Sequence, residues 1–236
     1  MSPTPAERRR RVWLFDLDDT LHHASNGLFA ELSQAMTDYI VRHLGLDEVQ
    51  AHELRQRYWR LYGATLLGLV RHHGVQAAHF LAETHALPRL EQQVRGSRAD
   101  LLALRRLPGR KVLLTNAPRR YALRVLDVLG VRSCFEQVLA VEQMRMFGQL
   151  RPKPDRRMFR HVAARLKTHP ARCTLVEDSL EHQKAARSLG MDTVWMQGWL
   201  RKATAAKQGH PGRRPLMLGR KPGYVGRRLR QLRSLR

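Results

Sequence analysis

The sequence is short of cysteine, of acidic residues and of long apolar runs. Its 236 residues include two cysteines, Cys134 and Cys173, which are too few for a disulfide framework. No apolar run approaches the roughly 20 residues of a membrane-spanning helix, and no secretory leader precedes the first apolar run. We therefore expect a cytoplasmic protein with no membrane partner.

The shortage of acidic residues is uneven along the chain. Lys and Arg number 43 against 20 Asp and Glu, which gives a net charge of +23 at pH 7. Twelve of those Lys and Arg, and no Asp or Glu, lie in residues 201–236. Such a charge is typical of proteins that contact polyanions, although a solvated extension without a partner explains it equally well. We predict that 200–236 is a basic, disordered tail with weak polyanion contact.

Short apolar runs that alternate with amphipathic helical patterns predict an α/β fold. The runs, rich in β-branched and aromatic residues, are typical of strands buried on both faces, and they lie at 12–15, 111–115, 137–141, 173–176 and 192–196. Helical patterns occupy 119–129, 155–166 and 180–189. This order predicts a doubly wound, mostly parallel (Rossmann-like) sheet.

One interval, 22–89, contains no convincing strand. Apolar residues recur there at helical spacing through 29–44, 47–61, 65–72 and 76–85. We therefore predict an all-helical insert directly after the first strand. An insert at the carboxyl end of a strand in an open α/β sheet would lie over the crevice where such folds bind ligands.

Acidic residues follow two of the predicted strands. Asp16 and Asp18 come directly after the first strand, and Glu177 and Asp178 follow the strand at 173–176. A polar turn is the simpler explanation of either pair taken alone. If the strands are neighbours, four carboxylates converge and repel one another unless a cation lies between them. Oxygen ligands in a crowded site favour Mg²⁺.

Three further residues complete a site of the size of a phosphate group. Thr115 and Asn116 end another strand and offer a hydroxyl and loop amides, and Lys153 lies between two prolines that restrict its backbone. Each feature is weak alone, because a strand-end Thr is usually a cap and a loop Lys is usually solvated. The ordered set is much more specific.

This ordered set resembles the haloacid dehalogenase (HAD) superfamily over about residues 11–199. Within the superfamily, the sequence looks most like the pyrimidine 5′-nucleotidase branch, through the segments FDLDDTL at 15–21, YGATLLGL at 62–69, LTNA at 114–117 and VEDS at 176–179. The resemblance implies a core built from 1–21 and 90–199, in which the first strand is central and flanked by the strands ending at Thr115 and Asp178. It also implies that 22–89 is a cap.

The resemblance assigns roles residue by residue. Asp16 matches the nucleophile, and Asp18 matches the general acid/base, whose backbone carbonyl, together with Asp16, Glu177 and Asp178, would bind Mg²⁺. Thr115, Asn116 and Lys153 would hold the phosphoryl oxygens. His22 stands where Tyr is frequent, and His182 stands where Asn is common. In the cap, His22 and Tyr62 are the two residues that we expect to face the substrate.

These roles imply an Mg²⁺-dependent phosphatase that forms an aspartyl-phosphate and acts on a small phosphorylated metabolite, foremost a pyrimidine nucleoside 5′-monophosphate such as UMP or CMP. A phosphatase or phosphomutase of a sugar phosphate is the alternative within enzymes. A nucleic-acid-binding protein acting through the tail is the alternative of another class. The pairs His22-His23 and His72-His73 lack the usual spacing of zinc ligands, and no ATP or NAD motif is present.

Overall fold

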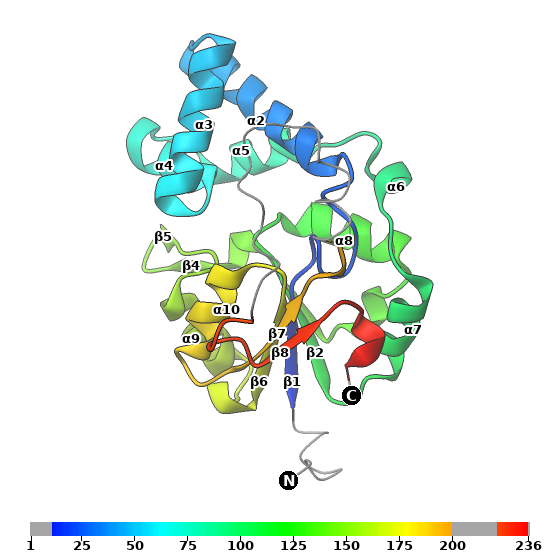
Figure 1. Ribbon diagram of the computed structural model, residues 1–236. Helices are drawn as coiled ribbons and strands as arrows, with labels where there is room; N and C mark the ends of the chain where they lie inside the picture. Colours follow the sequence, from blue (N-terminus) through cyan, green and yellow to red (C-terminus); the bar gives the residue numbers. More distant parts are fainter. Residues whose placement is uncertain (1–10, 200–220, 236) are drawn as a thin grey trace. The chain divides into compact units, whose positions relative to one another are not determined.

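The computed structural model describes residues 11–199 and 221–235, which divide into two compact units (Figure 1). The core unit contains the described residues before Gly27 and after Gln93, and the helical insert is Gly27–Gln93. The sequence placed this insert at 22–89. Residues 22–26 therefore belong to the core unit, whereas 90–93 belong to the insert.

The core unit is built around a six-stranded sheet in which every paired strand is parallel to its neighbour. The strands are β1 (Val12–Phe15), β2 (Arg110–Leu114), β3 (Gln137–Leu139), β6 (Cys173–Glu177), β7 (Asp192–Met196) and β8 (Arg227–Leu229), in the order β3-β2-β1-β6-β7-β8. All four residues of β1 are buried, as expected of a strand covered on both faces. The prediction that the first strand is central and lies between the second and fourth predicted strands is confirmed.

Helices cover both faces of this sheet, with α9 (Arg156–Arg165) and α10 (Leu180–Arg187) on one side and α7 (Arg98–Arg106) and α8 (Arg119–Val128) on the other (Figure 1). On the α9 side, Val12, Leu14 and Leu175 of the strands pack with Met158 and Phe159 of α9. A short hairpin, β4 (Arg145–Met146) and β5 (Gln149–Leu150), precedes α9. Within the described ranges, no helix is both long and apolar enough to cross a membrane.

The insert is all-helical, as the sequence predicts. Its helices are α2 (Leu28–Leu44), α3 (Glu48–Tyr62), α4 (Thr65–His73), α5 (Ala77–Thr84) and the short α6 (Leu90–Gln93). A capping box between Asp47 and Gln50 starts α3, and Gly63 ends it in the left-handed conformation. A Cβ atom at Gly68 would lie 2.1 Å from Cγ of Tyr58, so only glycine lets α3 and α4 approach this closely.

The predicted disorder of the C-terminal segment is wrong for 221–235, while 200–220 and 236 lie outside the described residues. Residues Arg227–Leu229 form β8, which pairs with β7. Val225, Leu232 and Leu235 are buried, and the backbone N–H of Arg233 donates to Asp100 Oδ1 on α7 at 3.0 Å. The segment is rich in Arg, Gly and Pro, so its composition did not predict a strand. An edge strand can form from such a segment because backbone hydrogen bonds to its neighbour supply much of its stability.

Candidate active site

The carboxyl ends of β1 and β6 bring three acidic side chains together. These strands are neighbours with Phe15 opposite Val176, and the backbone N–H of Asp16 extends the pairing by donating to the carbonyl of Val176 at 3.0 Å. One carboxylate oxygen from each of Asp16, Glu177 and Asp178 lies within 4.8 Å of the other two. The convergence predicted from two separate strand ends is therefore present for these three residues.

Lys153 is the cation within this cluster. Its side chain is 1% exposed, and its ammonium group donates to Asp16 Oδ1 at 2.6 Å and to Glu177 Oε2 at 2.7 Å. A buried ammonium held between two carboxylates is stabilised only by such pairing. The loop Lys predicted to bind phosphate therefore also joins the two strand ends.

The side chain of Asn116 positions Lys153 through a reciprocal pair of hydrogen bonds. Its amide group donates to the backbone carbonyl of Lys153 at 2.9 Å, and its carbonyl oxygen accepts from the backbone N–H of Lys153 at 2.9 Å. The phosphate contact expected of Asn116 stays a prediction, and the structure shows that its side chain holds the backbone of Lys153. The Thr115 hydroxyl accepts from the backbone N–H of Ala117 at 3.0 Å, which fixes the turn after β2.

The acidic side chains of the cluster perturb one another. Burial, reinforced by the charge of Glu177, raises the pKa of Asp16 to about 7, against the opposing effect of Lys153. Burial and the charges of Glu177 and Asp16 likewise raise the pKa of Asp178 well above its ordinary value. Burial acts in the same sense on Glu177, but Lys153 and His182 outweigh it and lower the pKa of that carboxyl.

For Asp16 and Asp178, burial is the largest cause of the raised pKa, and the neighbouring carboxylates add to it. Both effects favour the protonated carboxyl, and a divalent cation among the same oxygens would favour the carboxylate instead. The donor set of three carboxylates fits a hard cation that prefers oxygen ligands. Asp16, Glu177 and Asp178 are the residues that would hold it.

Asp18 lies outside this group of three and has partners of its own. Its Oδ1 atom accepts from the Tyr121 hydroxyl at 2.6 Å and lies 2.8 Å from Nε2 of His22. Burial and the charge of Asp18 raise the pKa of Tyr121 well above its ordinary value, so the phenol stays a donor. The carboxylate of Asp18 thus has partners different from those of the three clustered acids.

The structure corrects the expectation for His22. The sequence placed this residue at the start of the insert, whereas it belongs to the core unit, is fully buried and contacts Asp18. Its contact with substrate stays a prediction. His22 follows the last residue of β1 by only seven positions, and its backbone N–H donates to the carbonyl of Leu17 at 3.5 Å, so it lies in the loop that follows the strand. Tyr62 lies at the end of α3 with its hydroxyl 2.6 Å from His72 Nε2, and its contact with substrate stays a prediction.

Two residues of α10 that the sequence did not assign support the cluster. His182 Nδ1 lies 3.0 Å from Glu177 Oε2. Gln183 is fully buried and donates from Nε2 to the backbone carbonyls of Glu177 at 2.8 Å and Val194 at 2.7 Å, so it ties the end of β6 to β7. The signal for both was their position, one turn after Glu177-Asp178 at the start of a predicted helix.

The comparisons with known proteins agree with this geometry. Residues 11–190 match the family model described as haloacid dehalogenase-like hydrolase. The chain is 25% identical over 204 residues to phosphate metabolism protein 8 of Saccharomyces cerevisiae, an alignment that covers 81% of this chain and 62% of the relative. The chain thus spans less than two thirds of the length of that curated relative.

Solved structures share the fold across nearly the whole chain. They include CbbY from Rhodobacter sphaeroides in complex with phosphate, with a TM-score of 0.62, 17% identity and 96% of each chain covered. A HAD phosphatase from Thermococcus onnurineus has a TM-score of 0.58, with 19% identity and 94% of each chain covered. An L-2-haloacid dehalogenase from Xanthobacter autotrophicus has a TM-score of 0.57, with 15% identity and 96% of each chain covered.

Proposed function

The chain belongs to the haloacid dehalogenase-like hydrolase family, and within that family we propose that it is an Mg²⁺-dependent phosphatase of small phosphomonoesters. The observation that carries the proposal is the division of labour between the two acids at the end of β1. Asp16 belongs to the cluster suited to a cation, whereas Asp18 lies outside it and is held by Tyr121. Phosphomonoester hydrolysis needs both a nucleophile and a separate proton carrier.

The reaction proceeds in two displacements. In the first, a carboxylate oxygen of Asp16 attacks phosphorus, the bond between phosphorus and the leaving oxygen breaks, and that oxygen takes a proton from Asp18. In the second, Asp18 takes a proton from water as the water oxygen attacks the aspartyl-phosphate, which releases inorganic phosphate and restores Asp16. The two half-reactions return both acids to their starting states.

The remaining residues supply positive charge and orientation. Lys153 would bind a phosphoryl oxygen from its position beside Asp16, and Thr115 and the backbone amide of Asn116 would hold the others. Bound Mg²⁺ would neutralise the carboxylates and the developing charge on the phosphoryl group. A hydrolytic dehalogenation needs the nucleophile alone, so Asp18, Glu177 and Asp178 favour phosphoryl chemistry.

The substrate we propose is a pyrimidine nucleoside 5′-monophosphate such as UMP or CMP. The support is the set of sequence segments that resemble the pyrimidine 5′-nucleotidase branch, including the YGATLLGL segment that begins at Tyr62. The name of the yeast relative refers to phosphate metabolism, which agrees with the reaction class. A sugar phosphate, hydrolysed or isomerised by a phosphomutase reaction, is the alternative.

A substrate screen tests the proposal. The full chain, with Mg²⁺, is assayed for phosphate release from UMP, CMP, purine monophosphates and sugar phosphates. We expect turnover to require Mg²⁺ and to be fastest with UMP or CMP. Asp16→Asn should abolish phosphate release with the fold intact, while Asp127→Asn, at an exposed ion pair with Arg132, should leave it unchanged.

The outcomes separate the two levels of the proposal. A preference for sugar phosphates would overturn the proposed substrate but would agree with the proposed reaction. Conversion of a sugar phosphate to its isomer without release of phosphate would favour the phosphomutase. An Asp16→Asn variant that retains most of its phosphatase activity would overturn the mechanism.

A further inference from the structure

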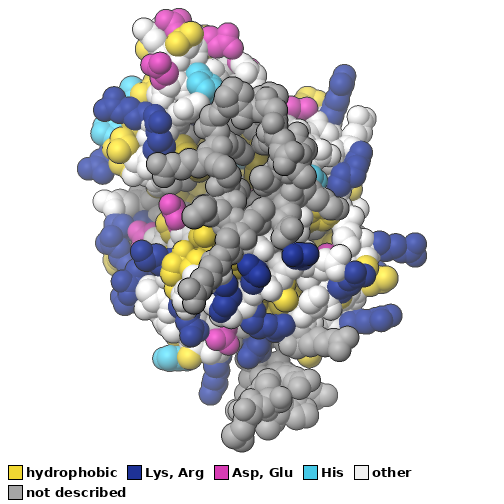
Figure 2. Space-filling view, viewed as in Figure 1, with side chains coloured by type: hydrophobic (Ala, Val, Ile, Leu, Met, Phe, Trp, Pro, Cys, Tyr) yellow, Lys and Arg dark blue, Asp and Glu magenta, His cyan; other side chains and the backbone are white. Residues whose placement is uncertain are grey.

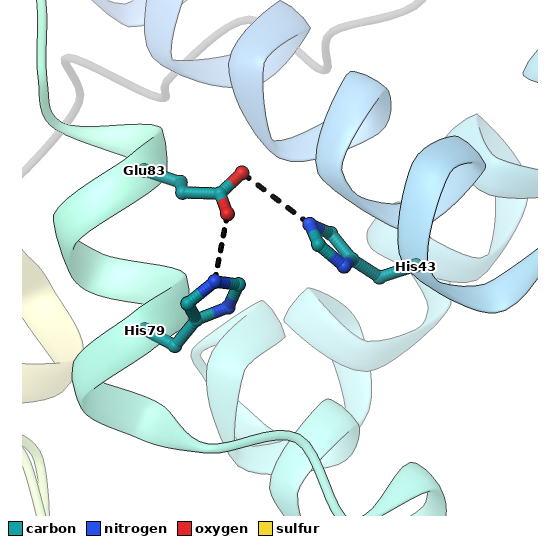
Figure 3. A group of neighbouring side chains, drawn as sticks. All are labelled: His43, His79 and Glu83. Atoms are coloured by element: carbon teal, nitrogen blue, oxygen red, sulfur yellow. Dashed lines mark hydrogen bonds and ion pairs between the residues drawn. The ribbon is translucent and has the colours of Figure 1, made fainter.

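We propose that the helical insert carries a metal site of its own, in which His43, His79 and Glu83 bind a transition-metal ion such as Zn²⁺. One ligand atom from each residue lies within 4.8 Å of the other two. Figure 3 shows the two imidazole rings and the carboxylate turned toward one another from two helices. This group lies in a different unit from the acidic cluster of the core and has a different donor chemistry.

The three side chains are brought together by the packing of α5 against α2. His79 and Glu83 are one turn apart on α5, so they lie on the same face of that helix, and His43 is in the last turn of α2. Glu83 Oε1 lies 2.8 Å from His79 Nε2, and Glu83 Oε2 lies 3.3 Å from His43 Nε2. Tetrahedral zinc with bonds of about 2.0–2.1 Å requires ligand atoms roughly 3.3 Å apart. Small side-chain rotations therefore suffice.

Tyr39 orients both histidines. It is 3% exposed, its hydroxyl lies 2.9 Å from His79 Nδ1, and its ring lies against that of His43 with centroids 4.2 Å apart. When His79 Nδ1 carries the proton and donates to Tyr39, Nε2 presents its lone pair toward Glu83 and His43. A hydrogen bond of this kind on the outer nitrogen accompanies most metal-binding histidines.

The donor set selects the class of metal. Two imidazole nitrogens and one carboxylate oxygen suit Zn²⁺, Cu²⁺ or Ni²⁺, and they suit Mg²⁺ poorly. The side chains of His43 and His79 are 35% and 49% exposed, so an ion reaches them from solvent and a water molecule completes the coordination. Three protein ligands and one open position are the pattern of zinc sites that keep a solvent ligand.

Arg42 is the competitor for this site. Its guanidinium lies 2.9 Å from Glu83 Oε2, and its side chain is 57% exposed. An exposed ion pair contributes little to stability, so a metal ion displaces it readily. If the three residues form only a surface network of hydrogen bonds and ion pairs, removing Arg42 has no consequence for metal affinity. If they form a metal site, removing Arg42 strengthens it.

The test measures Zn²⁺ affinity of the full chain by competition with a chromophoric chelator. An Asp178→Asn background with excess Mg²⁺ suppresses binding at the acidic cluster. We expect one zinc ion per chain, an affinity lower by on the order of tenfold or more in His43→Ala, His79→Ala and Glu83→Gln, and a higher affinity in Arg42→Ala. His52→Ala, which removes an exposed histidine of α3 that is not part of the group, should bind zinc as the background does.

A second measurement identifies the ligands directly. Cu²⁺ bound at this site should show electron paramagnetic resonance couplings from two imidazole nitrogens, and each His→Ala variant should lose one of them. Circular dichroism checks that the variants fold. Absence of stoichiometric binding, or equal zinc affinity in the background, His43→Ala and His79→Ala proteins, would overturn the proposal, whatever the phosphatase assay shows.

Discussion

At the scale of single residues, the two acids that end β1 are separated by their partners. Asp16 faces Lys153 and two further carboxylates, whereas Asp18 accepts from Tyr121 and contacts His22. The loop after β1 therefore supplies Asp16, which belongs to the cluster suited to a cation, and Asp18, which has other partners. Pairs of acids in contrasting environments are how enzymes assign a nucleophile and a proton carrier.

Removing the Tyr121 hydroxyl tests the role of Asp18. Tyr121→Phe keeps the buried ring and removes one donor to Asp18, so we expect phosphate release to slow by about tenfold or more, with a loss of about 1 kcal/mol in unfolding free energy. Tyr58→Phe is the matched control, because it removes a hydroxyl that contacts His73 in the insert. Equal turnover in the two variants would show that Tyr121 does not act through Asp18.

Replacing Lys153 tests the balance of charge in the acidic cluster. Lys153→Met keeps the length of the side chain but leaves Asp16 and Glu177 without their buried cation. We expect activity to fall by about 10²–10³-fold and the metal-free protein to lose roughly 3–5 kcal/mol of unfolding free energy. Chemical denaturation with and without Mg²⁺ measures this, and Mg²⁺ should restore part of the loss. A metal-free variant as stable as the parent would contradict the pairing.

The raised pKa of Asp16 makes the effect of Mg²⁺ depend on pH. Burial and the charge of Glu177 raise this pKa from 3.8 to about 7. Protonated Asp16 therefore contributes stability to the metal-free protein that is fully present below pH 3.8 and is lost as the pH rises through about 7. Above that pH, Mg²⁺ would relieve the repulsion between the ionised carboxylates. We expect Mg²⁺ to raise Tm more at about pH 8 than at about pH 5.5, and Asp178→Asn to reduce the difference. The same Mg²⁺ shift at both pH values would be evidence against cation binding here.

At the scale of elements, the sequence patterns predict the long, periodic segments well. The strand at 12–15 and the strand at 192–196 have the observed bounds, and the predicted ranges of α2, α3, α4 and α5 agree with the structure to within one residue at each end. The hairpin β4–β5, α6, α7 and β8 do not follow from the patterns. The two strands of the hairpin have two residues each and α6 has four, too few for a periodic pattern. α7 and β8 have partners distant in the sequence, as when Asp100 of α7 accepts from the backbone N–H of Arg233.

The same distinction holds within the site. Asp16, Glu177 and Asp178 follow from the strand ends, because parallel strands deliver their carboxyl ends to one edge. The side-chain bonds of Asn116 to Lys153, and the contact of Tyr121 with Asp18, join residues 37 and 103 positions apart. No local sequence pattern predicts contacts between residues so far apart in the chain. The assignment of His22 to the insert was wrong for the same reason. Its position in the sequence suggested the insert, but its contacts place it in the core unit.

At the scale of the whole molecule, the net charge is strongly positive, with 43 Lys and Arg against 20 Asp and Glu. Figure 2 shows Lys and Arg side chains distributed across the visible face of the described residues, without gathering into one patch. Within the described part of the C-terminal segment, Arg227–Leu229 form an edge strand of the sheet, and the arginines of 221–235 are exposed charges of the folded core unit. A distributed positive field would still help collect dianionic monophosphates, with an effect that weakens as salt rises.

Deleting 221–236 tests whether this segment acts through structure or through charge. The deletion exposes the edge of β7 and removes the buried Val225, Leu232 and Leu235, each worth about 1.5–3 kcal/mol, so we expect a clear fall in Tm and aggregation. Arg228→Gln with Arg230→Gln keeps β8 and removes two exposed charges, and it should fold as the parent does. If the double variant folded as the parent does but lost salt-dependent RNA binding, the polyanion role would be favoured instead.

The most direct test of the central claim is to look for the covalent intermediate. The full chain is mixed with Mg²⁺ and UMP, the reaction is stopped with acid within a turnover, and peptides are mapped by mass spectrometry. We predict the mass of one phosphoryl group on the peptide that contains Asp16, absent from Asp16→Asn. Phosphate release with no phosphoryl group on Asp16, or with the group on another residue, would contradict the mechanism.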